Sequence, residues 1–131
     1  MNYPQTILLT DDEAHIRKFI GLVLRKFDNP KLVEAADGIQ AVQLYKQNHP
    51  DLVLLDVNMP NMDGVRALEE IKRYDPDAVV VMLTSLANRQ TVEECLRLGA
   101  VAYIRKDTAR EDLTAQFERI IADCYDQGVP S

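Results

Sequence analysis

The sequence of 131 residues contains no tryptophan, only two cysteines and no long hydrophobic run. Cys95 and Cys124 lie far apart on helical patterns and match no metal-binding spacing, so we interpret both as buried, reduced thiols of a cytoplasmic protein. No apolar stretch approaches the roughly 20 residues that a membrane-spanning helix needs. The first residues also lack the basic and apolar regions of a signal peptide. We therefore expect an intracellular protein with no membrane partner.

The chain also lacks an excess of positive charge. It has 15 lysines and arginines against 21 aspartates and glutamates, which gives a formal net charge of −6 at pH 7. Binding to nucleic-acid phosphates needs a basic surface, so this balance argues against direct contact with nucleic acid. It permits a cationic protein partner or a divalent metal ion instead.

Short apolar runs alternate with amphipathic stretches along the whole chain. Five runs have the length and composition of buried strands, at residues 6–10, 32–35, 51–55, 78–83 and 101–104. Each is followed by apolar residues at helical spacing, and strict alternation of this kind predicts an α/β fold with a parallel sheet covered by helices on both faces. We expect a single domain at 1–131, with a core at about 5–125 and a frayed tail at 126–131.

Local signals predict several helix ends. Asp37 is expected to cap the helix that follows the second strand. Gly99 lies where a glycine would end the fourth helix. Two pairs have the spacing of a capping box, namely Thr91 with Glu94 and Thr108 with Glu111.

Acids, hydroxyls and a lysine fall at the carboxyl ends of four of the five expected strands. These residues are Asp11 and Asp12 after the first, Asp56 after the third, Thr84 and Ser85 after the fourth, and Lys106 after the fifth. Ligands bind outside this edge of an open parallel sheet, so the side chains should share one pocket. Each has a structural explanation when taken alone, because aspartates cap helices and start turns, and lysines at strand ends are commonly solvated. Their convergence favours a functional site.

Three carboxylates in one pocket repel each other unless a cation lies between them. Mg²⁺ fits, because it takes one or two carboxylates, keeps several waters and completes its shell with a substrate phosphate. A lysine and a hydroxyl can both donate to phosphoryl oxygens. The chain has no catalytic cysteine, serine–histidine pair or glycine-rich phosphate loop. We therefore interpret the pocket as a magnesium-assisted phosphoryl-transfer site with an aspartate as the nucleophile.

The sequence closely resembles the receiver domain of two-component response regulators, in particular the single-domain chemotaxis regulators. The motifs that carry the resemblance are Asp11–Asp12, Asp56 with Met59–Pro60 and Asp63–Gly64, Thr84–Ser85, and Lys106. The resemblance covers about residues 5–125. It implies a flavodoxin-like (β/α)5 fold with a doubly wound, five-stranded parallel sheet in the order 2-1-3-4-5. It also implies a phosphoprotein that acts as a signalling switch rather than as an enzyme.

The resemblance assigns roles to the residues of the pocket. Asp56 is the phosphoacceptor, and the donor is a histidine kinase or a histidine phosphotransfer protein. Asp12 is a direct Mg²⁺ ligand, Asp11 acts largely through water, and the backbone carbonyl of Asn58 supplies a further oxygen. Lys106 binds the phosphoryl group.

The resemblance also implies a switch. Thr84 is the hydroxyl that moves toward the phosphoryl group, carrying residues 85–88 with it, and Tyr103 is the aromatic that turns inward. This movement would reshape the face made by the fourth helix, the fifth strand and the last helix, which we expect to bind a downstream target protein. The residues expected on that face are Arg89, Glu93, Arg97 and Tyr103. The alternative for Tyr103 is an amphipathic strand residue with no special role.

One position departs from the family pattern. The family usually has proline after the lysine, often through a cis peptide bond, whereas Asp107 follows Lys106 here. A cis bond costs about 2.5–4 kcal/mol before a non-proline residue, against about 0.5–1 kcal/mol before proline. Either the site keeps that geometry, or the bond is trans and Lys106 reaches the pocket differently. Asp107 also adds a fourth acid nearby, unless it points outward.

Other functions compete with the receiver interpretation. The chain could be a degenerate receiver that binds partners without phosphorylation, or a receiver excised from a longer multidomain regulator. A hydrolase that forms an aspartyl-phosphate would want a second acid two residues after the nucleophile, where Asn58 stands. A flavodoxin-like cofactor binder would want a glycine- and hydroxyl-rich loop in place of Asp11 and Asp12. We expect a monomer or a weak dimer.

Overall fold

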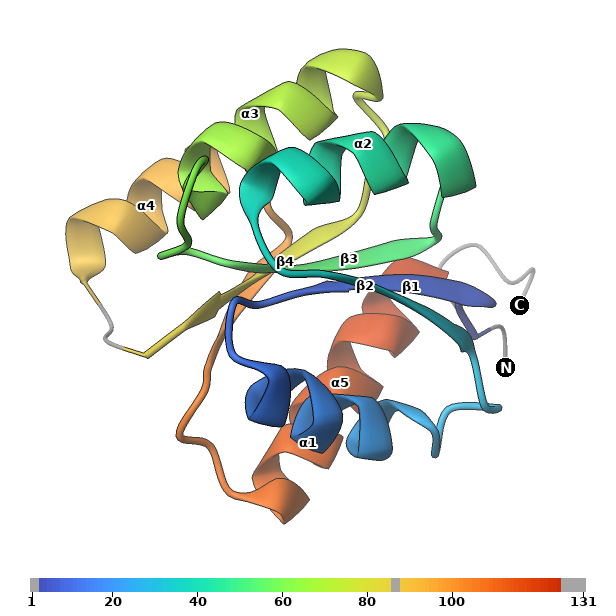
Figure 1. Cartoon of the computed structure of the whole chain (residues 1–131). Helices are drawn as coiled ribbons and strands as arrows, with labels where there is room; N and C mark the ends of the chain where they lie inside the picture. Colours follow the sequence, from blue (N-terminus) through green and yellow to red (C-terminus); the bar gives the residue numbers. More distant parts are fainter. Residues whose placement is uncertain (1–2, 86–87, 126–131) are drawn as a thin grey trace.

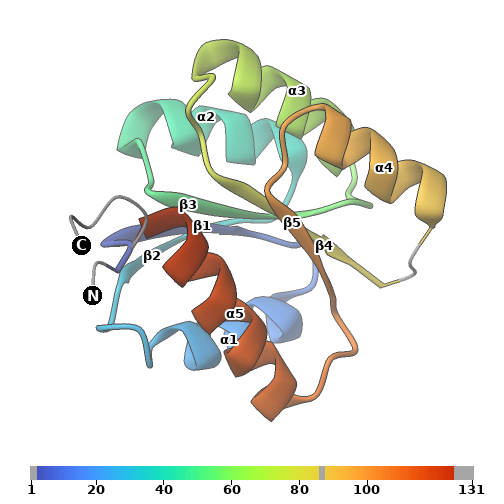
Figure 2. The same cartoon turned by 180° about the vertical axis from the view of Figure 1, so that it is seen from behind.

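The structure, a computed structural model, describes residues 3–85 and 88–125. Within these ranges the strands are β1 (Thr6–Thr10), β2 (Lys31–Ala35), β3 (Leu52–Asp56), β4 (Val80–Thr84) and β5 (Ala102–Arg105). The helices are α1 (Ala14–Leu24), α2 (Gly38–Asn48), α3 (Gly64–Tyr74), α4 (Arg89–Arg97) and α5 (Arg110–Tyr125). The strands form one parallel sheet in the order β2-β1-β3-β4-β5, as predicted. Helices α2, α3 and α4 cover one face and α1 and α5 cover the other (Figures 1 and 2).

The central strands are apolar because both of their faces are covered. Every residue of β3 and β4 is buried, which explains why their sequences show continuous rather than alternating hydrophobicity. The strands lie in a register that aligns their carboxyl ends. Asp56 at the end of β3 pairs with Leu83, and Thr84 at the end of β4 pairs with Arg105. Polar residues that end these strands are therefore brought to one edge of the sheet.

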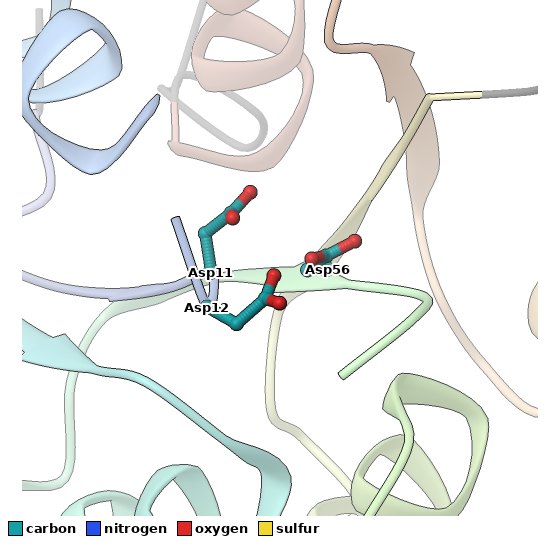
Figure 3. A group of neighbouring side chains, drawn as sticks. All are labelled: Asp11, Asp12 and Asp56. Carbon is teal, nitrogen blue, oxygen red and sulfur yellow. The ribbon is translucent and has the colours of Figure 1, made fainter. Parts of the chain in front are cut away.

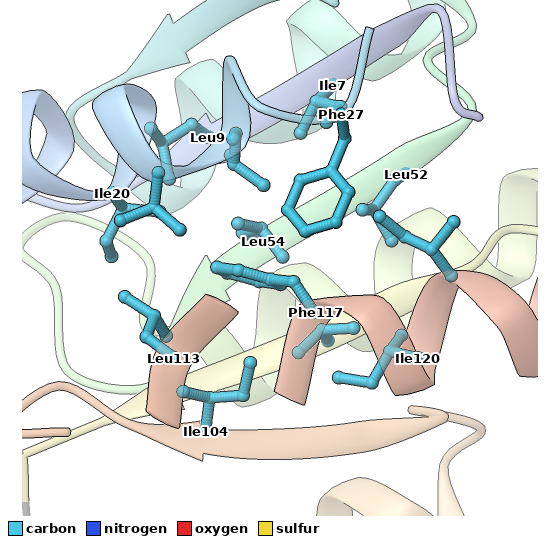
Figure 4. Close-up of a cluster of buried hydrophobic side chains, with 14 of the residues drawn as sticks. Ile7, Leu9, Ile20, Phe27, Leu52, Leu54, Ile104, Leu113, Phe117 and Ile120 are labelled. Atoms are coloured by element: carbon cyan, nitrogen blue, oxygen red, sulfur yellow. The ribbon is translucent and has the colours of Figure 1, made fainter. Parts of the chain in front are cut away.

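Two hydrophobic clusters fill the space between the sheet and its helices. The first lies between the sheet and helices α1 and α5 (Figure 4). At its centre the rings of Phe27 and Phe117 meet edge to face, with centroids 6.4 Å apart. The second cluster lies under α2, α3 and α4 and includes Cys95, which is buried as expected. Cys124 on α5 was also expected to be buried, but it is only partly buried and packs against the first cluster. Packing against both faces therefore holds the sheet in place, and with it the edge where the polar residues lie.

Two of the predicted helix ends are confirmed. The carboxylate of Asp37 accepts a hydrogen bond from the backbone N–H of Gln40 at 2.8 Å, so it caps α2. At the end of α4, Gly99 has a φ of 109°, a conformation that glycine adopts without a steric cost. The N–H groups of Gly99 and Ala100 donate to the carbonyls of Leu96 and Cys95, which is the Schellman arrangement.

Both predicted capping boxes are wrong. Helix α4 is capped by Asn88, whose side-chain oxygen accepts from the N–H groups of Gln90 and Thr91, so Thr91 lies inside the helix. Helix α5 begins at Arg110, and the hydroxyl of Thr108 instead donates to the carbonyl of Arg105 at 2.6 Å. The same threonine–glutamate spacing occurs within helices and in turns, so it does not by itself fix a helix start.

Strands β3, β4 and β5 begin and end one or two residues later than predicted. The shift matters because Asp56 and Thr84 become the last residues of their strands, where sheet hydrogen bonds hold their backbones. The expected frayed tail at 126–131 lies outside the described residues. Among the residues that are described, no helix has the length and apolar character needed to cross a bilayer.

Candidate functional site

Three aspartates meet at the carboxyl ends of β1 and β3. Asp11 and Asp12 follow β1, Asp56 ends β3, and one carboxylate oxygen of each lies within 4.8 Å of the others (Figure 3). Asp11 is fully buried and Asp56 is 2% exposed, whereas Asp12 is exposed. The cluster thus has a buried side, formed by two carboxylates, and one carboxylate that faces solvent.

The backbone holds the two buried aspartates firmly. The N–H of Asp11 donates to the carbonyl of Ala35, which continues the pairing of β1 with β2, and its Oδ1 accepts from the N–H of Glu13 at 2.9 Å. Asp56 pairs with Leu83 of β4, and its Oδ1 accepts from the N–H of Asn58 at 3.2 Å. Both carboxylates therefore point into the cluster from fixed positions.

Lys106 bridges the two buried carboxylates from the loop after β5. Its ammonium nitrogen lies 2.7 Å from Oδ2 of Asp11 and 2.9 Å from Oδ2 of Asp56, to which it donates a hydrogen bond. Glu13 lies farther away, with its Oε1 3.7 Å from the same nitrogen. The backbone N–H of Lys106 donates to the carbonyl of Thr84 at 2.8 Å, so the end of β4 anchors the residue. The Lys106 side chain is only 9% exposed.

The electrostatics of the cluster follow from burial and charge. Burial raises the pKa of Asp56 to about 6, and the charge of Asp11 adds to the rise, although the hydrogen bond from Lys106 opposes it. For Lys106, burial alone would lower the pKa, but the contacts with Asp11 and Asp56 outweigh it and raise the pKa above the usual value. Three carboxyl groups thus share the single ammonium group of Lys106.

The donor set suits a hard divalent cation. Asp11, Asp12 and Asp56 supply only carboxylate oxygens, which Mg²⁺ prefers over nitrogen and sulfur ligands. An exposed carboxylate beside two buried ones leaves part of the coordination shell open to water or to a phosphate oxygen. The residues present therefore fit Mg²⁺.

A small cavity of about 180 Å³ lies beside the cluster, between the end of β4 and the start of α4. Its lining residues are Val57, Asn58, Thr84, Asn88, Thr91 and Val92. Thr84 is 4% exposed, ends β4 and lines this cavity, so it lies next to both the cavity and the strand ends. The cavity provides space next to Asp56 in which neighbouring side chains can move.

The structure brings some predicted residues together and leaves others apart. Asp11, Asp12, Asp56 and Lys106 form the cluster, while Thr84 lines the neighbouring cavity. Tyr103 lies on β5 and is 44% exposed.

The remaining predicted residues belong to helix α4 and its approach. Arg89 and Glu93 form an ion pair with each other at 3.1 Å, and Arg97 is exposed at the end of the helix. Of the expected moving loop at 85–88, residues 86 and 87 lie outside the described residues. Helix α4 therefore contributes three charged residues to the expected partner face.

The structure shows the conformation of the peptide bond between Lys106 and Asp107. The bond is trans, since none of the residues described has a cis peptide bond, and Lys106 still reaches both carboxylates. Asp107 points away from the cluster and pairs with Arg105, whose Nη2 lies 3.0 Å from Oδ2 of Asp107. Asp107 is not a fourth acid of the site.

Sequence reasoning missed three features of this edge. It gave no role to Glu13, although its position directly after Asp11 and Asp12 was a signal. It did not anticipate the Arg105–Asp107 pair, which joins residues two apart in a loop and has no recognisable pattern. It also missed Asn88 as the cap of α4, although asparagine is among the preferred capping residues.

Comparisons with known proteins agree with this geometry. The family model of the response regulator receiver domain matches residues 7–118. The chain is 40% identical over 100 residues to the chemotaxis protein CheY of Bacillus subtilis, an alignment that covers 76% of this chain and 83% of that protein. It is 38% identical over 121 residues to the transcriptional regulatory protein PdtaR of Mycobacterium tuberculosis, covering 91% of this chain and 58% of the relative.

A solved structure is similar over nearly the whole chain. In the CheX-CheY-BeF3-Mg²⁺ complex from Borrelia burgdorferi, the matching chain has a TM-score of 0.84 and 31% sequence identity. The match covers 94% of this chain and 90% of that one. The fold, the sequence similarity and the acidic cluster therefore all agree with the family model of the response regulator receiver domain.

Proposed function

The chain belongs to the family of response regulator receiver domains, and on this basis we propose that Asp56 accepts a phosphoryl group from a histidine kinase or a histidine phosphotransfer protein. Receiver domains are in general signalling modules rather than enzymes. The acidic cluster is consistent with phosphoryl acceptance, because Asp56 ends a strand at the edge of the sheet with a lysine beside it. The outcome of the reaction is a modified protein whose surface differs from that of the free one.

The chemistry assigns a task to each residue of the cluster. A carboxylate oxygen of Asp56 attacks the phosphorus atom, the phosphorus–nitrogen bond of the phosphohistidine donor breaks, and the imidazole nitrogen keeps the electron pair and is protonated. The product on this chain is an acyl phosphate. Lys106 is near enough to donate to a phosphoryl oxygen carried by Asp56, since its ammonium lies 2.9 Å from the carboxylate.

Asp11, Asp12, Asp56 and the backbone carbonyl of Asn58 would hold Mg²⁺. When bound, the ion neutralises charge that would otherwise repel the phosphoryl donor. The oxygen-only donor set supports this assignment. The presence of BeF3 and Mg²⁺ in the Borrelia burgdorferi complex supports it independently.

We propose that phosphorylation acts on the face formed by α4, β5 and α5. A phosphoryl group adds about −1.5 to −2 charges and three acceptor oxygens. Thr84 lines the cavity beside Asp56, so its hydroxyl can move toward such a group and leave space that Tyr103 fills. A protein would then bind the altered face, in keeping with the complex that the Borrelia burgdorferi relative forms with CheX.

The observation that carries the proposal is the position of Lys106, 2.9 Å from Asp56 and 2.7 Å from Asp11. The test is incubation with Mg²⁺ and acetyl phosphate, followed by electrophoresis that retards phosphoproteins. We expect a retarded band that is absent for Asp56→Asn and absent without Mg²⁺. A chain that never becomes labelled would instead be a phosphorylation-independent interaction module, which is the second candidate.

A further inference from the structure

The loop between β5 and α5 is closed by an ion pair that spans Lys106. Nε of Arg105 lies 3.1 Å from Oδ1 of Asp107, and Nη2 of Arg105 lies 3.0 Å from Oδ2 of the same carboxylate. The two parallel contacts form a bidentate pair, the strongest geometry available to an arginine and a carboxylate. Lys106 is the residue between the two partners.

The backbone of the same loop is held by further hydrogen bonds. The hydroxyl of Thr108 donates to the carbonyl of Arg105 at 2.6 Å, and the N–H of Thr108 donates to the same oxygen at 3.2 Å. The N–H of Lys106 donates to the carbonyl of Thr84 on the neighbouring strand. The residues on both sides of Lys106 are therefore tied to each other, and Lys106 itself is tied to the sheet.

The position of the Lys106 ammonium group depends on how firmly this loop is held. Its long side chain has many rotamers, yet its ammonium group lies within 2.7–2.9 Å of two separate carboxylates and its side chain is 9% exposed. A shift of the ammonium group by about 1 Å away from the two carboxylates would lengthen both contacts beyond hydrogen-bond distance. Among the described residues, Arg105 and Asp107 form their ion pair with each other rather than with these carboxylates, and Lys106 is the residue that connects them to the cluster.

We propose that Arg105 and Asp107 are positioning residues, which fix the loop so that the ammonium group of Lys106 is held between Asp11 and Asp56. Asp107 performs this task from outside the pocket, and Arg105 offsets its charge. The catalytic consequence rests on the proposed function, because it assumes that Lys106 contacts the phosphoryl group. The placement of Lys106 does not rest on that function.

The expected effect is modest. Both partners are partly exposed, with 48% of the Arg105 side chain and 65% of the Asp107 side chain accessible to solvent. Exposed ion pairs have small effects, so we expect changes of roughly 3- to 5-fold rather than complete losses. The bidentate geometry places the pair toward the upper part of that range.

The first experiment measures the placement of Lys106 without any phosphorylation. The full chain is treated briefly with a trace of acetic anhydride, and modification of each lysine is measured by mass spectrometry. Lys72, whose ammonium group donates to the carbonyls of Pro76 and Ala78, is the internal reference. We expect Asp107→Ala and Arg105→Ala to raise the labelling of Lys106 relative to Lys72 by roughly 3- to 5-fold.

Arg66→Ala is the matched control. Arg66 also forms an exposed ion pair, with Glu70 at 3.1 Å, but on α3 and far from Lys106 in the sequence. It should leave the labelling ratio unchanged. The double variant Arg105→Ala with Asp107→Ala should label Lys106 no faster than either single variant, because one pair is lost in all three. Unchanged labelling in the single variants, or additive labelling in the double variant, would overturn the inference.

The second experiment tests whether the pair acts only through Lys106. Rates of phosphorylation by acetyl phosphate are compared for Asp107→Ala in the natural chain and in Lys106→Met. We expect a slower rate in the first background and no further slowing in the second. An equal slowing in both backgrounds would show that Asp107 does not position Lys106. If the natural chain is not phosphorylated at all, the proposed function fails, and the labelling experiment still decides the role of the pair.

Discussion

The ammonium nitrogen of Lys106 lies 2.9 Å from Oδ2 of Asp56, although the two residues are 50 positions apart in the sequence. The parallel sheet brings them together by placing the ends of β3 and β5 at the same edge. The same nitrogen lies 2.7 Å from Asp11, so one cation serves two buried carboxylates. Lys106 offsets only part of the unfavourable burial of the Asp56 charge, because burial still raises the pKa of Asp56 to about 6.

The raised pKa of Asp56 predicts how stability depends on pH. The folded pKa is about 6 against 3.8 for the unfolded chain, so the native state binds the proton more tightly. This contribution to stability is fully present below about pH 3.8 and is lost as the pH rises through about 6. A difference of 6 − 3.8 = 2.2 units corresponds to about 3 kcal/mol at most.

Asp56→Asn removes the charge whose burial is unfavourable. In the absence of divalent metal we expect this variant to have a larger free energy of unfolding than the natural chain at pH 8, by about 1–3 kcal/mol. The difference should narrow toward pH 4, where Asp56 in the natural chain becomes protonated. Urea unfolding with a chelator present, repeated between pH 4 and 8, measures both quantities. A less stable variant at pH 8 would contradict the prediction.

Mg²⁺ should stabilise the folded chain through the three aspartates. A ligand that binds only the native state adds about 2.7 kcal/mol at a concentration 100 times its dissociation constant. Asp12→Asn should remove most of this gain in thermal denaturation, because it takes away the exposed carboxylate of the cluster. Asp123→Asn, which changes an exposed acid on α5, should keep the full gain. Equal gains in the two variants would rule out the proposed metal site.

Replacement of Lys106 should have two consequences, and Mg²⁺ should largely reverse only the first. Lys106→Met leaves Asp11 and Asp56 buried without their cation, and we expect it to lower the free energy of unfolding by about 2 kcal/mol at pH 8 without metal. Saturating Mg²⁺ should recover much of this loss, because the ion supplies positive charge to the same carboxylates. Phosphorylation should nevertheless remain slower than in the natural chain, since no other predicted residue replaces the ammonium group. Denaturation and phosphorylation rates, both with and without Mg²⁺, test these expectations.

The sequence predicted the sheet and the cluster for a physical reason. Strands buried on both faces are continuous apolar runs, so an acid such as Asp56 that ends such a run marks the edge of the sheet. Parallel topology then brings the other strand ends to that edge, which is how Asp11, Thr84 and Lys106 could be grouped before their positions were known.

The parts that the sequence did not predict depend on short-range geometry. Asn88 and Thr91 are both reasonable helix caps, and only the backbone path decides that Asn88 caps α4. The pairing of Arg105 with Asp107 depends on side-chain rotamers within one turn, which no hydrophobic pattern reports. Strand ends moved by one or two residues for a similar reason, because neighbouring strands decide where pairing stops.

The close approach of α3 to the end of β3 gives a further prediction. A Cβ atom on Gly64 would lie well inside contact distance of the backbone carbonyl of Asp56, and backbone atoms cannot move aside as a flexible side chain can. The N–H of Gly64 also donates to the carbonyl of Val57 at 2.8 Å, which holds the loop close to the strand. Gly64→Ala must therefore displace either the loop or the carboxyl end of β3.

We expect Gly64→Ala to lower the free energy of unfolding by about 1–3 kcal/mol, in the range of other overpacked sites. It should also slow phosphorylation, because the displaced strand end carries Asp56. Gly21→Ala is the matched control, since its added Cβ would meet only the Leu32 side chain, at 3.1 Å, and alanine favours a helix interior. Urea unfolding and acetyl phosphate labelling of both variants provide the measurements. If Gly64→Ala matched Gly21→Ala in stability and in rate, the end of β3 would tolerate displacement, and the close packing beneath Asp56 would not be needed to position the phosphoacceptor.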